Sequence, residues 1–295
     1  MEFLRMLEGM RTPLLDKIMQ LVTYFGQELF IIAIICLLFW CMDKRFAYQL
    51  GFVYFTAGLC VQTLKITFRI PRPWVLDPNF HAVESAIPGA TGYSFPSGHT
   101  QGATSFFAPL ALKVRTSWAK LLCVLAFLLI GFSRMYLGCH TPKDVITAMI
   151  VSLICTYIIW HFQEKILGAN AHKGIIALIL AAVSLSTAIY SIVLLNKGVI
   201  EMKYAIDCCK AAGAGLGFAW GWYLETTRLD FDPTKGSTGF QILKYVLGLV
   251  LAIVIKSAFS FIFGKSILAK MAEYFILVLW IIYFYPCLFS KFKKR

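Results

Sequence analysis

Charged residues are scarce in this sequence, and acidic residues are the scarcest of them. Only 15% of the 295 residues are charged, whereas 59% are hydrophobic, and Asp and Glu together number 15. Soluble globular domains carry about a quarter charged residues and a smaller apolar share. The composition therefore excludes a disordered chain, a fibrous repeat and an ordinary soluble enzyme.

Other features are missing as well. The nine cysteines form no C-x-x-C or C-x-x-H pattern and the acidic residues form no cluster, so we expect neither a metal site nor a disulfide framework. No internal repeat occurs, which argues against a transporter built from repeated halves. No polar linker of useful length divides the chain. We therefore expect one polytopic membrane unit that binds no metal and no other cofactor.

Apolar runs of membrane-spanning length are present instead. A spanning helix needs about 20 mostly apolar residues. Nine segments approach this requirement, near residues 14–42, 46–66, 98–113, 117–137, 142–162, 174–195, 203–224, 240–263 and 270–290. The sequence thus predicts an all-α polytopic membrane helix bundle with about nine spans. Residues 1–10 have the pattern of an amphipathic segment that lies at the membrane interface.

The basic excess indicates how the chain is oriented. Lys and Arg number 28 and the formal net charge is +13. In so apolar a chain this excess favours membrane orientation over nucleic-acid binding, because Lys and Arg collect on the cytoplasmic side. The basic tail, Lys291, Lys293, Lys294 and Arg295, predicts a cytoplasmic C-terminus. With nine spans, the loop between the second and third spans and the loop between the fourth and fifth then lie on the outer face.

Three polar clusters lie in these two outer loops, where apolar spans end. The first runs from Lys65 to Pro73, the second from Pro96 to His99, and the third from Ser133 to Asp144. Residues 67–97, which join the first cluster to the second, hold half of the ten prolines. Ionisable residues at membrane depth usually mark a functional site, so we expect the clusters to converge.

The residue types suit the binding of a phosphate group. Lys65, Arg72 and Arg134 offer cationic donors, and a guanidinium can hold two phosphate oxygens at once. Ser97 and Gly98 stand at the expected start of a helix, where free N–H groups and the helix dipole favour an anion.

Two histidines of these clusters remain for the chemistry. His140 precedes Asp144 by four residues, and a carboxylate at this spacing can hold one imidazole nitrogen while the other attacks phosphorus. His99 has no such partner nearby in sequence and suits a general acid that protonates the leaving oxygen. A histidine mechanism of this kind needs no metal.

Together the clusters resemble the tripartite signature of the type 2 phosphatidic acid phosphatase superfamily. All eleven specified letters match in order, in Lys65-x6-Arg72-Pro73, Pro96-Ser97-Gly98-His99 and Ser133-Arg134-x5-His140-x3-Asp144. The resemblance implies a metal-independent phosphoric ester hydrolase that works through a phosphohistidine. It makes His140 the nucleophile, Asp144 its partner and His99 the acid and base. It assigns phosphate binding to Lys65, Arg72, Ser97, Gly98 and Arg134.

The resemblance also divides the chain. It implies a six-helix phosphatase core, which with the interfacial segment covers residues 1–200, and a C-terminal membrane extension of three helices over residues 201–295. Within that extension Gly213, Gly217 and Gly221 repeat every four residues. Small residues at this spacing let two membrane helices approach closely, so we expect a packing seam there.

The sequence does not determine which phosphate ester is the substrate. Members of the family hydrolyse lipid phosphates and pyrophosphates, and a site at the membrane surface favours a membrane lipid as substrate. A glucose-6-phosphatase-like branch is similar in having nine spans, and a lipid phosphotransferase would use the same phosphohistidine. We expect the plasma membrane with the site facing outward, or the endoplasmic reticulum with a lumenal site if the source is eukaryotic. The sequence says nothing about the oligomeric state.

Overall fold

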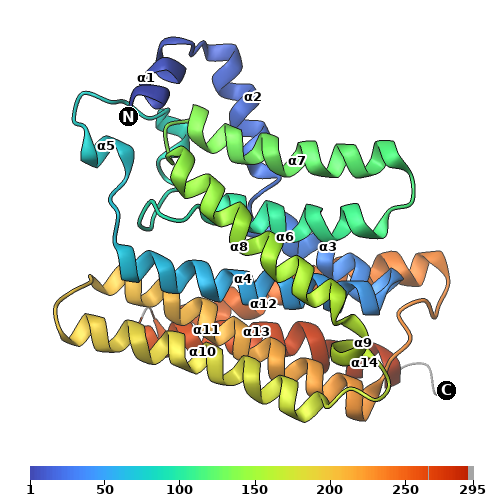
Figure 1. Cartoon of the computed structure of the whole chain (residues 1–295). Helices are drawn as coiled ribbons and strands as arrows, with labels where there is room; N and C mark the ends of the chain where they lie inside the picture. Colours follow the sequence, from blue (N-terminus) through green and yellow to red (C-terminus); the bar gives the residue numbers. More distant parts are fainter. Residues whose placement is uncertain (265, 292–295) are drawn as a thin grey trace. The chain divides into compact units, whose positions relative to one another are not determined.

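Helices form over all nine apolar segments. The structure, a computed structural model, describes residues 1–264 and 266–291, and no strand occurs within those ranges (Figure 1). The all-α bundle predicted from the sequence is confirmed. In chain order the helices are α1 (Glu2–Gly9), α2 (Pro13–Tyr24), α3 (Glu28–Leu37), η1 (Leu38–Met42), α4 (Lys44–Phe68), α5 (Pro73–Leu76), η2 (Glu84–Ala86), α6 (Gly98–Lys113), α7 (Ser117–Tyr136), α8 (Pro142–His161), α9 (Gln163–Leu167), α10 (Lys173–Asn196), α11 (Met202–Leu224), η3 (Glu225–Leu229), α12 (Thr238–Phe263), α13 (Ile267–Leu279), η4 (Trp280–Phe284) and α14 (Tyr285–Lys291).

Fewer helices than nine have the length and composition of a membrane span. Among the described residues six segments qualify, and a seventh is added if α2 and the Glu28–Met42 helix, bent by 43°, count as one span. The other two predicted spans fall short for different reasons. Helix α6 has only 16 residues, and α11 has the length but combines several glycines with charged residues in its first turns.

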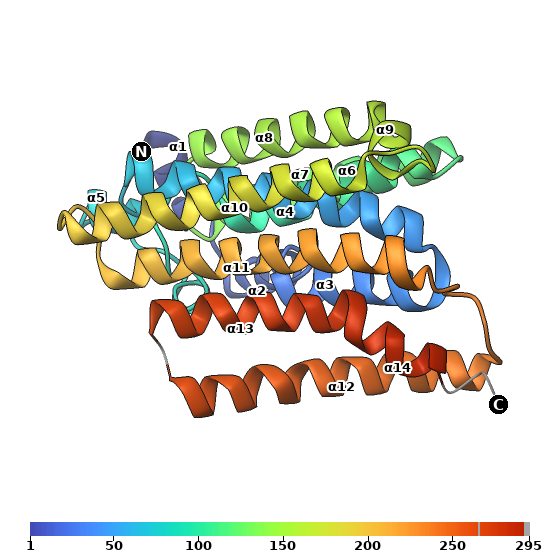
Figure 2. The ribbon, with the colours of Figure 1, turned by 90° about the horizontal axis from the view of Figure 1, so that it is seen from below.

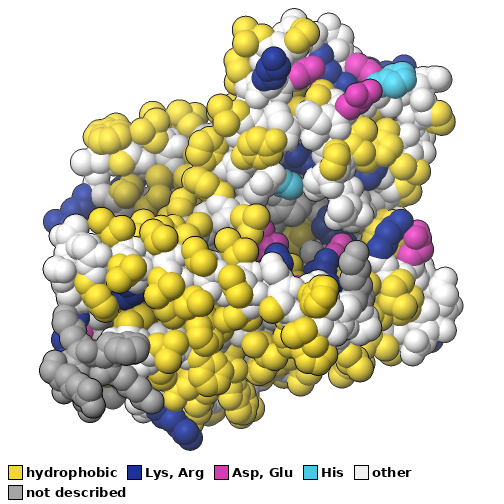
Figure 3. All heavy atoms as spheres, turned by 180° about the vertical axis from the view of Figure 1, so that it is seen from behind, with side chains coloured by type: hydrophobic (Ala, Val, Ile, Leu, Met, Phe, Trp, Pro, Cys, Tyr) yellow, Lys and Arg dark blue, Asp and Glu magenta, His cyan; other side chains and the backbone are white. Residues whose placement is uncertain are grey.

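Apolar side chains remain exposed along the spans. On α12, Ile253, Val254 and Phe261 are 64%, 54% and 91% exposed, and hydrophobic side chains cover most of the face shown in Figure 3. An apolar surface of this extent indicates a lipid environment. The chain is an integral membrane protein. Three of the four basic tail residues on which the predicted orientation rests, Lys293 to Arg295, lie outside the described residues.

The chain folds as two compact units, each made of two separate stretches. Unit 1 comprises Met1–Ile32 and Cys60–Trp160, and unit 2 comprises Ala33–Leu59 and His161–Arg295. Helix α4 contributes its first residues to unit 2 and its last residues to unit 1. All three polar clusters therefore belong to unit 1, because the first of them begins near the end of α4.

In unit 1, helix α7 packs against α6 and α2. Helices α6 and α7 meet in a buried apolar cluster, in which Ala103 and Ala108 of α6 contact Phe127 and Ile130 of α7. Alanine at two of the four positions lets the helix backbones approach closely. This packing fixes the N-terminal end of α6 and the C-terminal end of α7, the two helix ends that carry the second and third clusters.

Helix α1 packs against the rest of unit 1 along one of its edges. Leu4 and Leu7 are 1% and 4% exposed and pack with Phe80 from the loop after α5. Met6 and Met10 remain 56% and 60% exposed. The segment is amphipathic as predicted, but one apolar edge packs against protein and only the remainder is available to the membrane interface.

In unit 2, helix α11 packs between α10 and α13 (Figure 2). A Cβ atom added to Gly213 would lie 2.1 Å from the carbonyl oxygen of Met271, and one added to Gly217 would lie 2.5 Å from that of Phe275. Added at Gly221, it would lie 3.0 Å from the side chain of Ile282. Since real Cβ atoms do not approach backbone this closely, the predicted glycine seam is confirmed, and its partner is α13 with η4.

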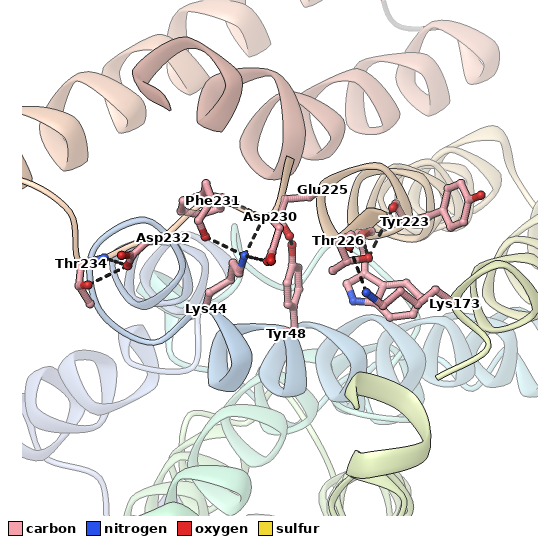
Figure 4. Close-up of polar contacts among 11 residues, drawn as sticks. Lys44, Tyr48, Lys173, Tyr223, Glu225, Thr226, Asp230, Phe231, Asp232 and Thr234 are labelled. Carbon is pink, nitrogen blue, oxygen red and sulfur yellow. Dashed lines mark hydrogen bonds and ion pairs between the residues drawn. The ribbon is translucent and has the colours of Figure 1, made fainter. Parts of the chain in front are cut away.

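A buried carboxylate ties the beginning of α4 to the end of α11 within unit 2. Figure 4 shows Lys44 and Tyr48 of α4 pointing toward Glu225, which is fully buried. Lys44 Nζ lies 2.9 Å from Glu225 Oε1, and the Tyr48 hydroxyl donates a hydrogen bond to Oε2. The backbone N–H of Phe231 donates to Oε1 at 3.0 Å. The Glu225 carboxylate is thus satisfied by three donors from two distant segments.

We predict that this carboxylate matters far more for stability than a comparable exposed one. Lys44 keeps Asp230 and the Phe231 carbonyl as acceptors in Glu225→Ala. The Tyr48 hydroxyl and the Phe231 N–H lose the acceptor they share, and each buried donor left unsatisfied costs about 1–3 kcal/mol. The control is Glu164→Ala, since the Arg45–Glu164 pair is 52% and 73% exposed and such pairs contribute below about 1 kcal/mol. Unfolding in a detergent titration measures both, and equal losses would contradict the prediction.

Candidate active site

The other seven predicted site residues gather around the imidazole of His140. His140 lies in the loop between α7 and α8, and Lys65, Arg72, His99 and Arg134 all act on it electrostatically. These residues come from the end of α4, the following loop, the start of α6 and the end of α7. Ser97 and Asp144 join the same group through the backbone, because Ser97 N–H donates to the Asp144 carbonyl at 3.1 Å. Segments far apart in the sequence thus form one site.

Arg72 holds the imidazole in place. Its Nε donates to the carbonyl of Gly92 at 2.8 Å, and its Nη1 donates to the carbonyl of Cys139 at 3.0 Å. The same Nη1 lies 2.9 Å from His140 Nε2. A guanidinium has donors only, so Nε2 must be the unprotonated nitrogen and a neutral His140 carries its proton on Nδ1. Nε2 therefore presents a lone pair on the side of the cations.

The carboxylate of Asp144 lies on the opposite side of the ring. Its Oδ2 is 3.6 Å from His140 Nδ1, longer than a hydrogen bond. Its hydrogen bonds come from the Ser94 hydroxyl at 2.6 Å and the Thr141 N–H at 2.8 Å. The predicted pair is adjacent, and the negative charge of Asp144 faces the nitrogen that bears the proton. Ser94 was missed from the sequence, where only its place three residues before Ser97 could have drawn attention.

The cations are buried, and one of them has N–H groups to spare. Arg134 is 1% exposed and its Nη1 donates to the Thr23 hydroxyl of α2 at 3.1 Å. Its Nε and Nη2 have no hydrogen-bond partner among residues 1–264 and 266–291. Lys65 is 7% exposed and its Nζ donates to the carbonyl of Tyr93 at 2.7 Å. Burying a donor without an acceptor costs free energy. The Arg134 guanidinium therefore favours the binding of an anionic ligand.

The first turn of α6 supplies further donors. Ser97 is the N-cap, and its hydroxyl accepts from the Thr100 N–H. A Cβ added at Gly98 would meet nothing within 4 Å, so open space lies in front of the first helical turn. His99 follows and is half-buried. The first N–H groups of a helix have no partner inside it, and here an anion can reach them.

The environment keeps His140 in its neutral form. Burial, followed by the positive charge of Arg72, lowers the pKa of the His140 imidazole well below its ordinary value of 6.5. Both effects penalise the imidazolium. Across the neutral pH range Nε2 therefore keeps its lone pair, which in this structure accepts the hydrogen bond of Arg72.

The donor set fits a tetrahedral oxyanion. Two guanidinium groups, an ammonium and a helix N-terminus surround a neutral imidazole, while a second imidazole stands at the helix start. Within residues 1–264 and 266–291 no three His, Cys, Asp or Glu side chains gather as a metal site would require. The arrangement can bind a phosphate group and place a nitrogen nucleophile beside its phosphorus.

Comparisons with known proteins relate the chain to a family of phosphatases. Residues 46–167 match the family model described as the PAP2 superfamily, and residues 209–295 match the one described as PAP2 superfamily phosphatase, transmembrane extension. The first match contains all three polar clusters. No solved structure gives a significant match.

The chain is similar to curated phosphatases over different lengths. It is 35% identical to undecaprenyl-diphosphatase BcrC of Bacillus subtilis over 37% of the chain and 53% of that protein. It is 25% identical to phosphatidylglycerophosphatase B of the same organism over 53% of the chain and 79% of that protein. It is 24% identical to sphingosine-1-phosphate phosphatase 1 of Rattus norvegicus over 79% of the chain and 57% of that protein. The alignments thus span little more than half the length of the first and third of these relatives.

We predict that the His140 imidazole is still neutral at pH 6.5, where an ordinary histidine is half protonated. The folded-state pKa is lowered, so protonation should begin only as the pH falls further. NMR titration of the 15N-labelled protein without substrate measures this, and the signal is assigned by its absence from the His140→Ala variant. Half protonation of His140 at pH 6.5 or above would contradict the prediction.

Proposed function

The chain belongs to the PAP2 superfamily, and on this premise we propose that it is a membrane phosphatase that cleaves a lipid phosphate monoester or pyrophosphate. The observation that carries the proposal is the unprotonated Nε2 of His140, placed among Lys65, Arg72 and Arg134. Such a constellation provides a nucleophile and a phosphate cradle at the same point.

In the first step, His140 Nε2 attacks the phosphorus atom and the bond from phosphorus to the ester oxygen breaks. Arg72, Lys65 and the spare Nε and Nη2 groups of Arg134 hold the phosphoryl oxygens and stabilise the charge that develops on them. Burial and then the charge of Arg134 lower the pKa of His99, whereas the negative charge of a bound phosphate raises it. With substrate bound, His99 can thus carry the proton that it donates to the departing oxygen. The product is a phosphohistidine, whose positive ring charge faces Asp144.

In the second step, a water molecule attacks the phosphohistidine and the bond from phosphorus to nitrogen breaks. His99, now unprotonated, accepts the proton of this water, and inorganic phosphate leaves. Asp144 stays ionised throughout and keeps His140 in the required orientation, as the carboxylate of a catalytic triad does. Every group in this cycle belongs to the protein, so the reaction needs no metal ion.

A lipid is the substrate class that the setting favours. The site lies where α4, α6, α7 and α8 end or begin, so headgroups of the surrounding membrane are its natural neighbours. The named activities of the three relatives all concern lipids. Of the three, the sphingosine-1-phosphate phosphatase aligns over the largest share of this chain, which makes a sphingoid phosphate the first compound to test.

We propose that the two parts of the chain have different roles. Residues 1–200 would carry the reaction and residues 201–295 would form the membrane extension. The two separate family matches, over residues 46–167 and 209–295, support this proposal. We propose that the site opens to the outer face of the plasma membrane, or to the lumen if the membrane is that of the endoplasmic reticulum. A glucose-6-phosphatase-like reaction and phosphate transfer to a second lipid remain the alternatives.

The test is release of inorganic phosphate by the purified chain in detergent with EDTA present. We expect hydrolysis of at least one of phosphatidic acid, an isoprenoid pyrophosphate and a sphingoid phosphate, in preference to glucose 6-phosphate. His140→Ala should lower kcat by at least about 1000-fold, because removing a nucleophile leaves only binding and charge stabilisation. The control variant is His172→Ala, because His172 is an exposed histidine at the start of α10. This variant should retain full activity.

Two results would contradict the proposal. Full activity of His140→Ala would exclude it as the nucleophile, and complete loss of activity on chelation would exclude the metal-independent mechanism. Preference for glucose 6-phosphate would favour the sugar-phosphate alternative, and phosphate transfer to an added lipid alcohol would favour the transferase.

A further inference from the structure

Arg11 lies outside the three clusters, yet it joins the two loops that build the site. It stands in the link between α1 and α2. Its Nε donates to the carbonyl of Tyr136 at 3.0 Å, and its Nη1 donates to the carbonyl of His81. Tyr136 ends α7, just before the turn to His140, whereas His81 belongs to the loop that follows Arg72. One planar guanidinium therefore bridges the backbones of both loops.

The fit around this guanidinium is close. Gly138, two residues before His140, has a φ of 79°, and a Cβ added there would lie 2.8 Å from Arg11 Nη2 and 3.0 Å from Ala82 Cα. The guanidinium carbon is 5.4 Å from the centre of the Phe80 ring. Glycine at position 138 thus serves two needs at once, the left-handed turn and the space for Arg11.

The turn from Tyr136 to His140 is held at both ends by arginine. Arg11 binds the carbonyl of Tyr136, and Arg72 binds the carbonyl of Cys139 while touching His140 itself. A third bond, from the N–H of Val83 to the carbonyl of Leu137 at 3.0 Å, fastens the middle of the turn to the same loop that carries His81. The position of the imidazole is therefore set by how firmly these carbonyls are held.

Helix α1 keeps Arg11 where it is needed. Leu4 and Leu7 are buried against Phe80, and Glu8 Oε1 accepts from the N–H of His81 at 2.9 Å. The side chain of Arg5 pairs with Asp77 on the same loop, but it is 50% exposed. The segment before Arg11 is thus docked to the loop that Arg11 holds, and Arg5 makes a peripheral contact of the same kind.

We propose that Arg11 is a positioning residue for the nucleophile, acting through the carbonyls of Tyr136 and His81 without touching the substrate. The inference rests on the proposed function of His140. A planar fork of donors can reach two carbonyls at once, which a lysine ammonium cannot do in the same geometry. Loss of the fork would let the turn move, and a misplacement near 1 Å can cost about 100-fold in rate.

The test compares three variants of the full chain on the best lipid phosphate. Arg11→Gln should lower kcat by about 100-fold with little change in KM, because the phosphate cradle of Arg72, Lys65 and Arg134 is left intact. Arg11→Lys keeps one cationic donor and should recover part of the loss. Arg5→Gln, the matched control on the same segment, should leave kcat within about twofold of wild type, since an exposed ion pair contributes little.

The outcomes separate this inference from the one on which it rests. An active wild type with unchanged kcat in Arg11→Gln, or a change confined to KM, would overturn the positioning role alone. If Arg11→Gln does not fold, as judged by its thermal melt, Arg11→Lys decides in its place, and wild-type kcat in that variant would overturn the role. An inactive wild type would contradict the proposed function and this inference together.

Discussion

Buried positive charge is the constraint on which the rest of unit 1 depends. Lys65, Arg72 and Arg134 are 7%, 8% and 1% exposed, and Asp144 is the one buried carboxylate within residues 1–32 and 60–160, all of which the structure describes. Removing an ion from water costs several kcal/mol unless neighbouring groups compensate. Backbone carbonyls accept from Arg72 and Lys65, but among the described residues Nε and Nη2 of Arg134 have no acceptor. The result is a cluster of buried cations that an anion stabilises.

The charged groups of this cluster also hold together the segments that carry them. Asp144 draws in Ser94 by a hydrogen bond and Ser97 by its carbonyl, so the third cluster is attached to the second. Arg72 attaches the first cluster to the turn that carries His140. The N-terminal helices complete the enclosure, with Thr23 on Arg134 and Arg11 on the two loops. One network of contacts therefore assembles the candidate site, and the same network would bind the phosphate and orient the proposed nucleophile.

How much of this could be predicted from the sequence depends on the range of each interaction. The helices were predicted within a few residues, because long apolar runs mark them directly. The clusters were recognised because the spacing within each is short and specific. The bend between α2 and α3 had no proline to signal it. Thr23 is 111 residues from Arg134 in the chain and looks like any threonine in an apolar helix. Arg11 belongs to no motif of the sequence, and only the folded backbone brings it to Tyr136.

The central claim is that His140 forms a covalent bond to phosphorus, and the stereochemistry of the reaction tests it most directly. Each in-line displacement inverts the configuration at phosphorus, so two successive displacements restore it. A lipid phosphorothioate made chiral at phosphorus with two oxygen isotopes, hydrolysed in water of the third isotope, reports the result in the released thiophosphate. A phosphohistidine intermediate predicts net retention of configuration. Net inversion would mean that water attacks the substrate directly, and it would contradict the phosphohistidine mechanism.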